Sequence, residues 1–384
     1  MSGSFNIKKL FSLNDEKLIL WLFVSVFLPF YLTGAVLFAA IFYIIKFKKL
    51  PNVFEKNGNV WALAFAIYTF AVGLLNLNFV GAACSIGFIA LVIIGAFTRK
   101  YITAASFEKG LSYACVCGVV TAFICLIDFL YNELILNHPG VYRCTLYFLN
   151  SNYLATLFAT VIIVCGYKVL YHKGRAINYY FAALICAVGA YLTGSMFVWV
   201  EVFIGCAALL GFTRRHQMLS ALFLLAGTGI IVLYCMPGIL PRIQDSNITT
   251  DNRVIIWTVT LKAIKAATPF FGQGFLTYFH IQGNYPESYP TAHSHSIFLE
   301  PIASYGIIGT VLIVIFFIYF YKRVITCRNA QNKFGMSALI LAITCAILVH
   351  ATTDLTFMWI QTGLFYCLIM SGIGIEEKLL KIER

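Results

Sequence analysis

The chain of 384 residues is 61% apolar and 16% aromatic, and only 11% of its residues are charged. Soluble domains are about half apolar and a quarter charged, so this composition excludes a water-soluble globule, a disordered chain and a disulfide scaffold. The net charge of +12 does not indicate nucleic-acid binding, because the basic residues lie in short clusters between apolar runs. The sequence predicts an all-α polytopic membrane protein embedded in the lipid bilayer.

The first apolar run, 18–45, would be about 42 Å long as a helix, which is too long for one upright span. Pro29 lies within it and removes a helical hydrogen bond, so a kink or a tight hairpin is expected, and we favour the hairpin. About 12 transmembrane segments then result. The further predicted spans are 60–77, 79–97, 110–130, 152–171, 177–194, 196–213, 217–236, 301–321, 336–354 and 356–374.

In this arrangement most of the 27 Lys and Arg residues fall on one side, which the positive-inside rule assigns to the cytoplasm. Both termini are then cytoplasmic. No cleavable signal peptide is expected, because the first run is too long and is followed by more spans. The basic residues on the outer side are Arg143, Arg242, Arg253, Lys262 and Lys265.

Two outer connections are long, a medium loop at 131–151 and a large loop at 237–300 that precedes the tenth span. A loop as long as the second is usually functional in a compact protein, and this one holds most of the outer basic residues. It divides the chain into N-terminal helices with the medium loop (1–236), the large extracytoplasmic loop with an amphipathic helix (237–300), and C-terminal helices with a short cytoplasmic tail (301–384).

Within the large loop, Asp251 is expected to cap a helix from Asn252 to about Thr268, which Pro269 ends. Arg253 and Trp257 then share one face. An Arg beside a Trp suits a phosphate and a stacked sugar ring. An interfacial helix anchored at the headgroup level explains the same residues equally well.

Two motifs follow in the same loop. PFFGQGF (269–275) predicts a turn, since no strand precedes it and no Gly-Lys-Ser/Thr follows it. TAHSHSIFLEP (291–301) places His293, His295 and Glu300 just before a span. Histidine exchanges protons near neutral pH, which favours general base chemistry. A metal site is weakly supported, because no acidic or Cys partner is close in sequence, and a purely structural role for the histidines stays open.

Polar residues also occur at or within the predicted spans. His350 and Asp354 are four residues apart at the outer end of a span and are expected to share a face, so that the carboxylate orients or pairs with the imidazole. Glu201 lies inside a span. Carboxylates at such positions are costly and indicate function, but the sequence names no partner for it.

Taken together, these segments resemble the O-antigen ligase and O-antigen polymerase family of membrane glycosyltransferases. The strongest similarity covers RVIIWTVTLKAIKAATPFFGQGF (253–275) and AHSHSIFLEPIASYGIIG (292–309). RCTLYFLNSNYLA (143–155) is similar to the family's outer Arg and its Asn-x-Asn entry to a span. YLTGS (191–195) and HATTD (350–354) are similar to two further segments.

The sequence departs from the family pattern at two positions. Met196 stands where the family has an Arg after the Ser, so one phosphate contact is missing or comes from elsewhere. Ser296 replaces the usual Asn after the second histidine, which weakens any role for that amide.

The resemblance implies transfer of glycan from a polyprenyl (undecaprenyl) diphosphate donor to a glycan or lipid-linked acceptor, on the outer face of the bacterial cytoplasmic membrane, without a metal or other cofactor. It implies His295 as the base, with His293 second. The diphosphate would be held by Arg143 and Arg253, with help from Arg242. The supporting residues would be Trp257, Asn150, Asn152, Glu300, His350 and Asp354.

The sequence does not identify the acceptor, so a ligase that transfers finished glycan and a polymerase that joins repeat units both fit. It does not indicate the oligomeric state either. A secondary transporter or flippase of lipid-linked glycan is the alternative. Transporters usually place charges at mid-membrane on broken helices, whereas the polar cluster of this chain is predicted outside.

Overall fold

The computed structural model describes residues 14–54, 58–136, 142–171, 176–236, 246–266, 269–330 and 335–381, with the side chains of 52, 53 and 246–251 excepted. Within these ranges the fold is built from helices and contains no strand. Five of the described helices, among them Phe79–Tyr101 and Ser151–Tyr171, are long and apolar enough to cross a membrane by length and composition. The all-α membrane fold is therefore confirmed at this level, and the count of 12 spans stays a prediction.

The helices of the first half are α2 (Asp15–Ser25), α3 (Phe30–Lys46), α4 (Leu50–Val53), α5 (Asn59–Leu75), α6 (Phe79–Tyr101), α7 (Ala104–Leu134), the 3₁₀ turn η1 (Leu146–Phe148), α8 (Ser151–Tyr171) and α9 (Ala176–Leu192). Those of the second half are α10 (Phe197–Phe212), α11 (His216–Cys235), α12 (Ser246–Ala266), α13 (Thr277–Ile281), η5 (Gln282–Asn284), the π-helical turn η6 (Pro301–Tyr305), α14 (Gly306–Asn329), α15 (Met336–Ala351), η7 (Thr356–Met358), α16 (Ile360–Ser371) and α17 (Ile373–Leu379).

The first apolar run forms the predicted hairpin. The chain breaks between α2 and α3 at Pro29, and the Thr33 hydroxyl donates to the carbonyl of Ser25 at 2.7 Å across the break. The start of α2 also contacts the end of α3 and the residues after it. Asp15 forms an ion pair with Lys49 and accepts a hydrogen bond from the Tyr43 hydroxyl at 2.9 Å. With 11 residues, α2 is about 16 Å long, about half the thickness of the hydrocarbon core.

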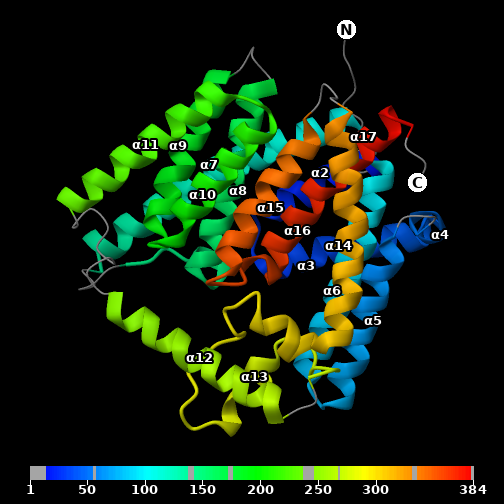
Figure 1. The fold of residues 1–384 in the computed structure, drawn as a ribbon. Coiled ribbons are helices and arrows are strands. Elements are labelled where there is room, and N and C mark those ends of the chain that lie inside the picture. Colours follow the sequence, from blue (N-terminus) through cyan, green and yellow to red (C-terminus); the bar gives the residue numbers. More distant parts are fainter. Residues whose placement is uncertain are drawn as a thin grey trace.

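A bundle of packed helices surrounds α8 (Figure 1). Most residues of α8 are buried, and it contacts α9, α10 and α15. Its sequence is apolar on all sides, as expected for a helix enclosed by others. By contrast, α11 contacts α10 and has no buried residue, so its apolar side chains face the surroundings of the bundle.

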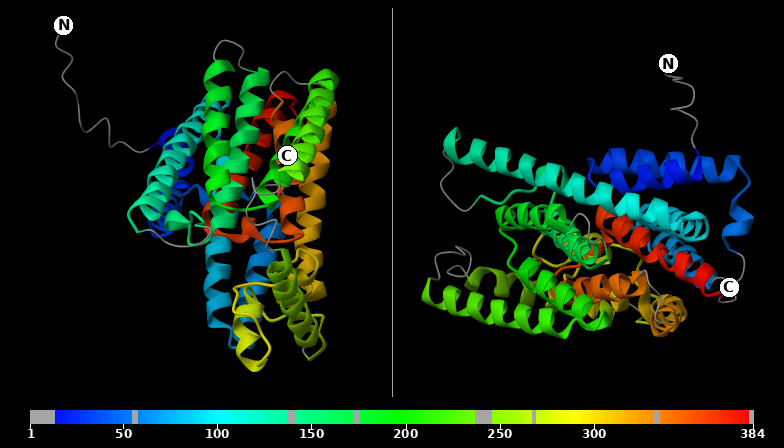
Figure 2. Two further views of the ribbon diagram at one scale, coloured as in Figure 1. Left: turned by 90° about the vertical axis from the view of Figure 1, so that its left-hand side faces the viewer. Right: turned by 90° about the horizontal axis from the view of Figure 1, so that it is seen from above.

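The large loop lies against the ends of three helices. In both views, α5, α6 and α14 extend beyond the rest of the bundle, and the loop with α12 and α13 lies beside their projecting ends (Figures 1 and 2). The backbone of Ile307 and Ile308 in α14 donates to the carbonyls of Pro269 and Phe270 at 3.0 and 3.1 Å. The loop is therefore packed against the helices. This packing places its histidine segment at the end of the bundle.

Candidate functional site

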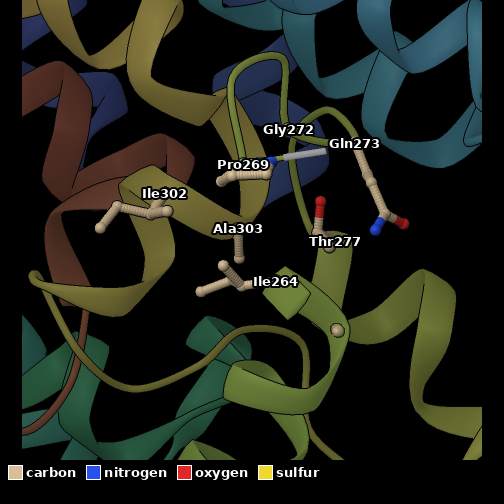
Figure 3. A pocket seen from close by; sticks show the side chains of 8 residues that line it. Ile264, Pro269, Gly272, Gln273, Thr277, Ile302 and Ala303 are labelled. Carbon is tan, nitrogen blue, oxygen red and sulfur yellow. The ribbon is translucent and has the colours of Figure 1, made fainter. Parts of the chain in front are cut away.

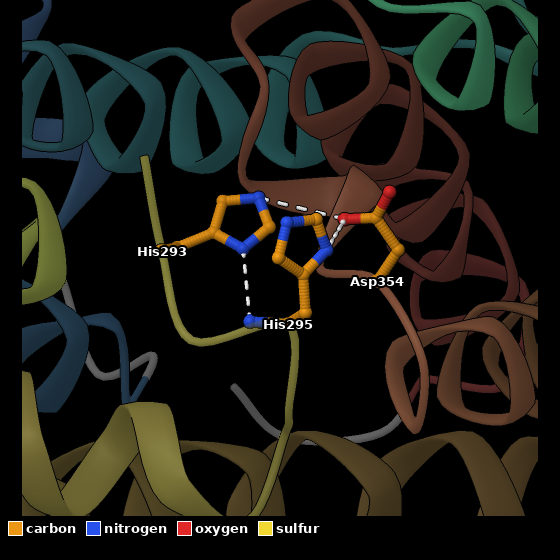
Figure 4. A group of neighbouring side chains, drawn as sticks. All are labelled: His293, His295 and Asp354. Atoms are coloured by element: carbon orange, nitrogen blue, oxygen red, sulfur yellow. Dashed lines mark hydrogen bonds and ion pairs between the residues drawn. The ribbon is translucent and has the colours of Figure 1, made fainter. Parts of the chain in front are cut away.

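The two histidines of the large loop meet Asp354 at one point (Figure 4). Asp354 lies in the turn between α15 and η7. Nδ1 of His295 is 3.1 Å from Oδ1 of Asp354, and Nε2 of His293 is 3.5 Å from the same oxygen. His293 and Asp354 are almost fully buried, whereas the His295 side chain is 18% exposed. Of the three, His295 is the side chain most open to a substrate.

The contacts of each histidine ring indicate which of its nitrogens carries the proton. The backbone N–H of His295 donates to Nδ1 of His293 at 3.2 Å, so a neutral His293 carries its proton on Nε2. His295 turns Nδ1 toward Asp354, which favours a proton on that nitrogen and a lone pair on Nε2. The Thr291 hydroxyl lies 2.8 Å from this Nε2 and can donate to it. His295 thus presents Nδ1 to Asp354 and Nε2 to the Thr291 hydroxyl.

Glu300 holds the turn that carries the histidines. One carboxylate oxygen accepts a hydrogen bond from the backbone of Ser294 at 2.8 Å, and the other accepts from the Ser304 hydroxyl at 2.6 Å. His295 has a φ of 52°, in the left-handed region that non-glycine residues rarely adopt. Glu300, which is 1% exposed, therefore supports the conformation of the turn and faces away from solvent.

Asp354 is linked to Arg143 through an amide. Nδ2 of Asn152 donates to Oδ2 of Asp354 at 2.6 Å, and Oδ1 of Asn152 accepts from Nη2 of Arg143 at 3.0 Å. Burial alone would raise the pKa of Asp354, but its contacts with His295, His293 and Asn152 outweigh burial and hold the pKa well below its usual range. Burial lowers the pKa of His293. The centre thus combines a carboxylate that favours its charged form with a buried His293 whose charged form is disfavoured.

The YLTGS segment positions Arg143. Nε of Arg143 donates to the carbonyl of Thr193 at 3.1 Å. Gly194 has a φ of 61°, and a Cβ on it would lie 3.1 Å from Cγ of Arg143, so glycine suits both the backbone and the close approach. Met196 follows at the N-cap position of α10. The segment therefore has a role in the site although it lacks the family's Arg.

Two other residues of the motifs have local structural roles. Oδ1 of Asn150 accepts from the backbone N–H of Asn152 at 2.8 Å and so caps the start of α8. The hydroxyl of Ser296 accepts from the backbone N–H groups of Phe298 and Leu299 at 3.3 and 3.4 Å. A Ser therefore serves this turn in the place of the family's Asn.

The predicted pair of His350 and Asp354 does not form. α15 ends at Ala351, so Asp354 lies beyond the helix and its carboxylate turns to the loop histidines. His350 instead places Nδ1 2.6 Å from Oε2 of Glu201 on α10. The Thr156 hydroxyl joins this pair, 3.3 Å from the same carboxylate oxygen. Glu201, for which the sequence named no partner, is thus paired inside the bundle beneath the site.

The amphipathic helix of the large loop is present, but it is displaced from its predicted bounds. α12 starts at Ser246, so the predicted cap Asp251 lies inside the helix. Arg253 and Trp257 lie one turn apart on α12, as predicted. Trp257 packs against a cluster of Ile256, Val259 and Tyr278. Arg242 lies outside the described residues.

The PFFGQGF segment is a docking turn whose glycines are required by close backbone packing (Figure 3). A Cβ on Gly272 would lie 2.5 Å from the nitrogen of Gly306, and a Cβ on Gly306 would lie 2.4 Å from the carbonyl oxygen of Phe270. The backbone of Gly274 donates to the carbonyl of Ser304 at 2.8 Å. This turn and the Gly-Ile-Ile-Gly segment (306–309) thus form one unit that fixes the loop to the start of α14.

The site includes an aromatic pair that the sequence interpretation missed. Tyr153 of α8 stacks on Trp359 with ring centroids 5.1 Å apart and an interplanar angle of 16°. The Tyr153 hydroxyl lies 3.4 Å from Nε2 of His293. Tyr153 follows Asn152 directly, so the similarity of the 143–155 segment offered a signal for it. Trp359, at the start of α16, lies outside the motifs and gave none.

His293, His295 and Asp354 also offer three possible metal ligands, whose ligand atoms lie within 4.8 Å of one another. A histidine that binds a metal usually donates its second ring N–H to an acceptor. Nδ1 of His293 instead accepts the backbone N–H of His295, so its Nε2 bears the proton in the neutral ring. This hydrogen bond therefore makes His293 a poor metal ligand.

The class defined by this fold and site is a helical membrane protein in which histidines of the large loop meet a carboxylate from the turn after α15. Residues 181–314 match the family model described as O-antigen ligase, which confirms the family resemblance indicated by the motifs. The match includes Arg253, Trp257 and both loop histidines, whereas Arg143, Asn152 and Asp354 lie outside it. No curated protein matches the chain significantly.

Proposed function

We propose that the protein is a glycosyltransferase that moves or polymerises glycan from a polyprenyl diphosphate donor on the outer face of the bacterial cytoplasmic membrane. The observation that carries this proposal is the contact of His295 with Asp354, next to Asn152 and Arg143. A base and a phosphate-binding cation thus lie in one site. The match to the O-antigen ligase family supports an enzyme of this class.

In the proposed reaction, His295 is the general base. An acceptor sugar hydroxyl replaces the Thr291 hydroxyl at Nε2 of His295 and gives up its proton as its oxygen attacks the anomeric carbon of the donor. The bond between that carbon and the diphosphate oxygen breaks, and polyprenyl diphosphate leaves. Asp354 stabilises the imidazolium that forms, because the carboxylate already faces Nδ1.

Arginine side chains stabilise the negative charge of the leaving group. A diphosphate gains negative charge as it departs, and preorganised guanidinium groups stabilise that charge without a metal. Arg143 is fixed by Asn152 and by the carbonyl of Thr193. Arg253, on α12, and Arg242, which precedes that helix in the sequence, are the further arginines that we assign to the diphosphate. His293 supports the base through Asp354 and takes no proton itself, because burial disfavours its charged form.

The stacked pair of Tyr153 and Trp359 is the sugar platform that we favour. Sugar rings pack on aromatic faces, and this pair lies beside His293. Trp257 is the second candidate for stacking on a sugar ring. The contact of His350 with Glu201 holds α15 against α10 below the site. The bilayer supplies the donor lipid, and no cofactor has a role in this mechanism.

The glycan profile of a deletion strain tests the function and separates its two forms. Lipid-linked and surface glycans would be compared in the deletion strain and in the strain complemented with the wild-type gene. Single repeat units in place of long chains identify a polymerase. Full-length chains left on polyprenyl diphosphate identify a ligase. An unchanged profile in a glycan-producing strain would contradict the proposal.

A further inference from the structure

A cavity of about 220 Å³ lies between α5, α6 and α14, far from the histidine centre. Arg323 is 17 residues beyond Gly306 along α14, which corresponds to about 26 Å. Two arginines and several aromatic side chains form most of its lining: Trp61, Arg99, Phe316, Tyr319, Phe320 and Arg323. It lies at the end of the bundle that the positive-inside rule assigns to the cytoplasm.

The two arginines are held in place by one carboxylate. Arg99 is 6% exposed, and its Nε and Nη2 donate to the two oxygens of Glu377 at 3.1 and 2.5 Å. Nη1 of Arg323 lies 3.4 Å from Oε1 of the same carboxylate. A guanidinium has five N–H donors, so an arginine in an ion pair can also bind a phosphate oxygen. Two guanidinium groups from different helices thus line the cavity and are held by the same carboxylate.

The other walls suit the region between headgroups and acyl chains. The Arg99 guanidinium lies 5.7 Å from the centre of the Phe320 ring. Tyr319 and Val60 are 53% and 57% exposed, and Ile318 beside them is 61% exposed. Trp and Tyr are enriched at the level of lipid headgroups, and basic pockets between helices on the cytoplasmic side bind anionic headgroups. The cavity thus joins a basic wall to an apolar outer surface.

The volume restricts the occupant. Water takes about 30 Å³ in the liquid, so the cavity holds the equivalent of about seven waters. Drug-sized ligands usually occupy pockets of about 300 Å³ or more, so a small group such as a phosphate suits this cavity better than a glycan chain. We propose that the cavity binds the phosphate of an anionic phospholipid such as phosphatidylglycerol, with its acyl chains along the exposed face of α5 and α14. This site is separate from the proposed transfer reaction.

Native mass spectrometry of the purified protein in micelles with equal amounts of phosphatidylglycerol and phosphatidylethanolamine tests this proposal. We expect selective retention of phosphatidylglycerol by the wild type and at least a fivefold loss in Arg323→Gln. Lys322→Gln is the matched control, because it removes an exposed charge from the next position of α14. Equal retention of the two lipids by the wild type, or equal phosphatidylglycerol retention by Arg323→Gln and Lys322→Gln, would overturn the proposal.

A second variant and a second ligand complete the test. If Arg323→Gln does not fold, the double variant Arg99→Gln, Glu377→Gln removes both charges of the buried pair and is also expected to lose the lipid. Short-chain phosphatidylglycerol should raise the Tm of the wild type but not that of the double variant. If inorganic phosphate raises the Tm by the same amount, the cavity is a site for free phosphate and the lipid assignment is wrong.

Discussion

At the scale of single residues, Arg143 shows how the site depends on a forked side chain. Its Nη2 donates to Asn152 and its Nε donates to the backbone carbonyl of Thr193. Lysine has one nitrogen and cannot make these contacts together. The side chain of Arg143 is therefore positioned by its neighbours as well as by its charge.

The substitution Arg143→Lys is expected to lower kcat/KM for glycan transfer by about 10- to 100-fold, because a hydrogen bond to a charged group contributes about 1.5–3 kcal/mol. The measurement is transfer from a lipid-linked donor by purified protein. Arg215→Lys, at an exposed arginine before α11, should retain the wild-type rate. A wild-type rate for Arg143→Lys would remove Arg143 from the diphosphate site.

Removal of divalent metal tests the assignment of the histidine protons. Because Nδ1 of His293 accepts the backbone N–H of His295, Nε2 holds a proton and offers no lone pair to a metal. We therefore expect a chelator such as EDTA to leave the transfer rate unchanged. A loss of activity with EDTA that added metal restores would contradict the metal-free mechanism.

The sequence identified most of these residues, and the reason for each error is physical. His293, His295, Arg143 and Asn152 were found through the motifs, and they do meet. The partner of Asp354 was wrong because the four-residue spacing from His350 assumed a continuous helix, whereas α15 ends at Ala351. Long-range partners such as Glu201 and His350 have no signature in sequence spacing.

At the scale of elements, the docking turn at 269–275 joins the large loop to the start of α14. Gly272 and Gly306 have φ values of 70° and 62°, and each lies against the backbone of the other segment. The sequence predicted a turn here, but it gave no indication of what the turn packs against. The glycine spacing is explained by backbone contact, and no phosphate contact is needed to account for it.

Substitution of Gly272 by Ala should therefore detach the loop. The left-handed φ costs about 1–2 kcal/mol for a residue with a Cβ, and the clash with Gly306 adds to this cost. We expect a lower Tm and a large loss of transfer activity. Gly283→Ala is the control in the same loop, since a Cβ there meets nothing within 4 Å. Equal Tm and activity for the two variants would contradict this role of the turn.

At the scale of the whole molecule, the distribution of basic residues predicts the orientation of the chain in the membrane. The loop with α12 and α13 lies at one end of the long helices (Figure 1). Arg99 and Arg323 lie near the C-terminal ends of α6 and α14. The hydropathy of the chain predicted an all-α fold with long apolar helices, and five of the described helices are long and apolar enough to cross a membrane. The exact spans were less predictable, because α7 is longer and α2 shorter than the apolar runs suggested.

The proposed topology can be measured with a membrane-impermeant thiol reagent on intact cells. In a background with the exposed Cys84 and Cys235 changed to Ser, Gly283→Cys should react from outside. His216→Cys, at the first residue of α11, should react only after the cells are permeabilised, because the positive-inside rule places that helix end in the cytoplasm. The reverse pattern of labelling would show that the large loop is cytoplasmic.

The most direct test of the account is the transfer rate of His295→Ala in purified, folded protein. A general base contributes about 10²- to 10⁴-fold to a rate, so we expect a loss in this range. His280→Ala, at an exposed histidine of the same loop, should transfer glycan at the wild-type rate. If His295→Ala also transfers glycan at the wild-type rate, His295 is not the base and the proposed mechanism is wrong.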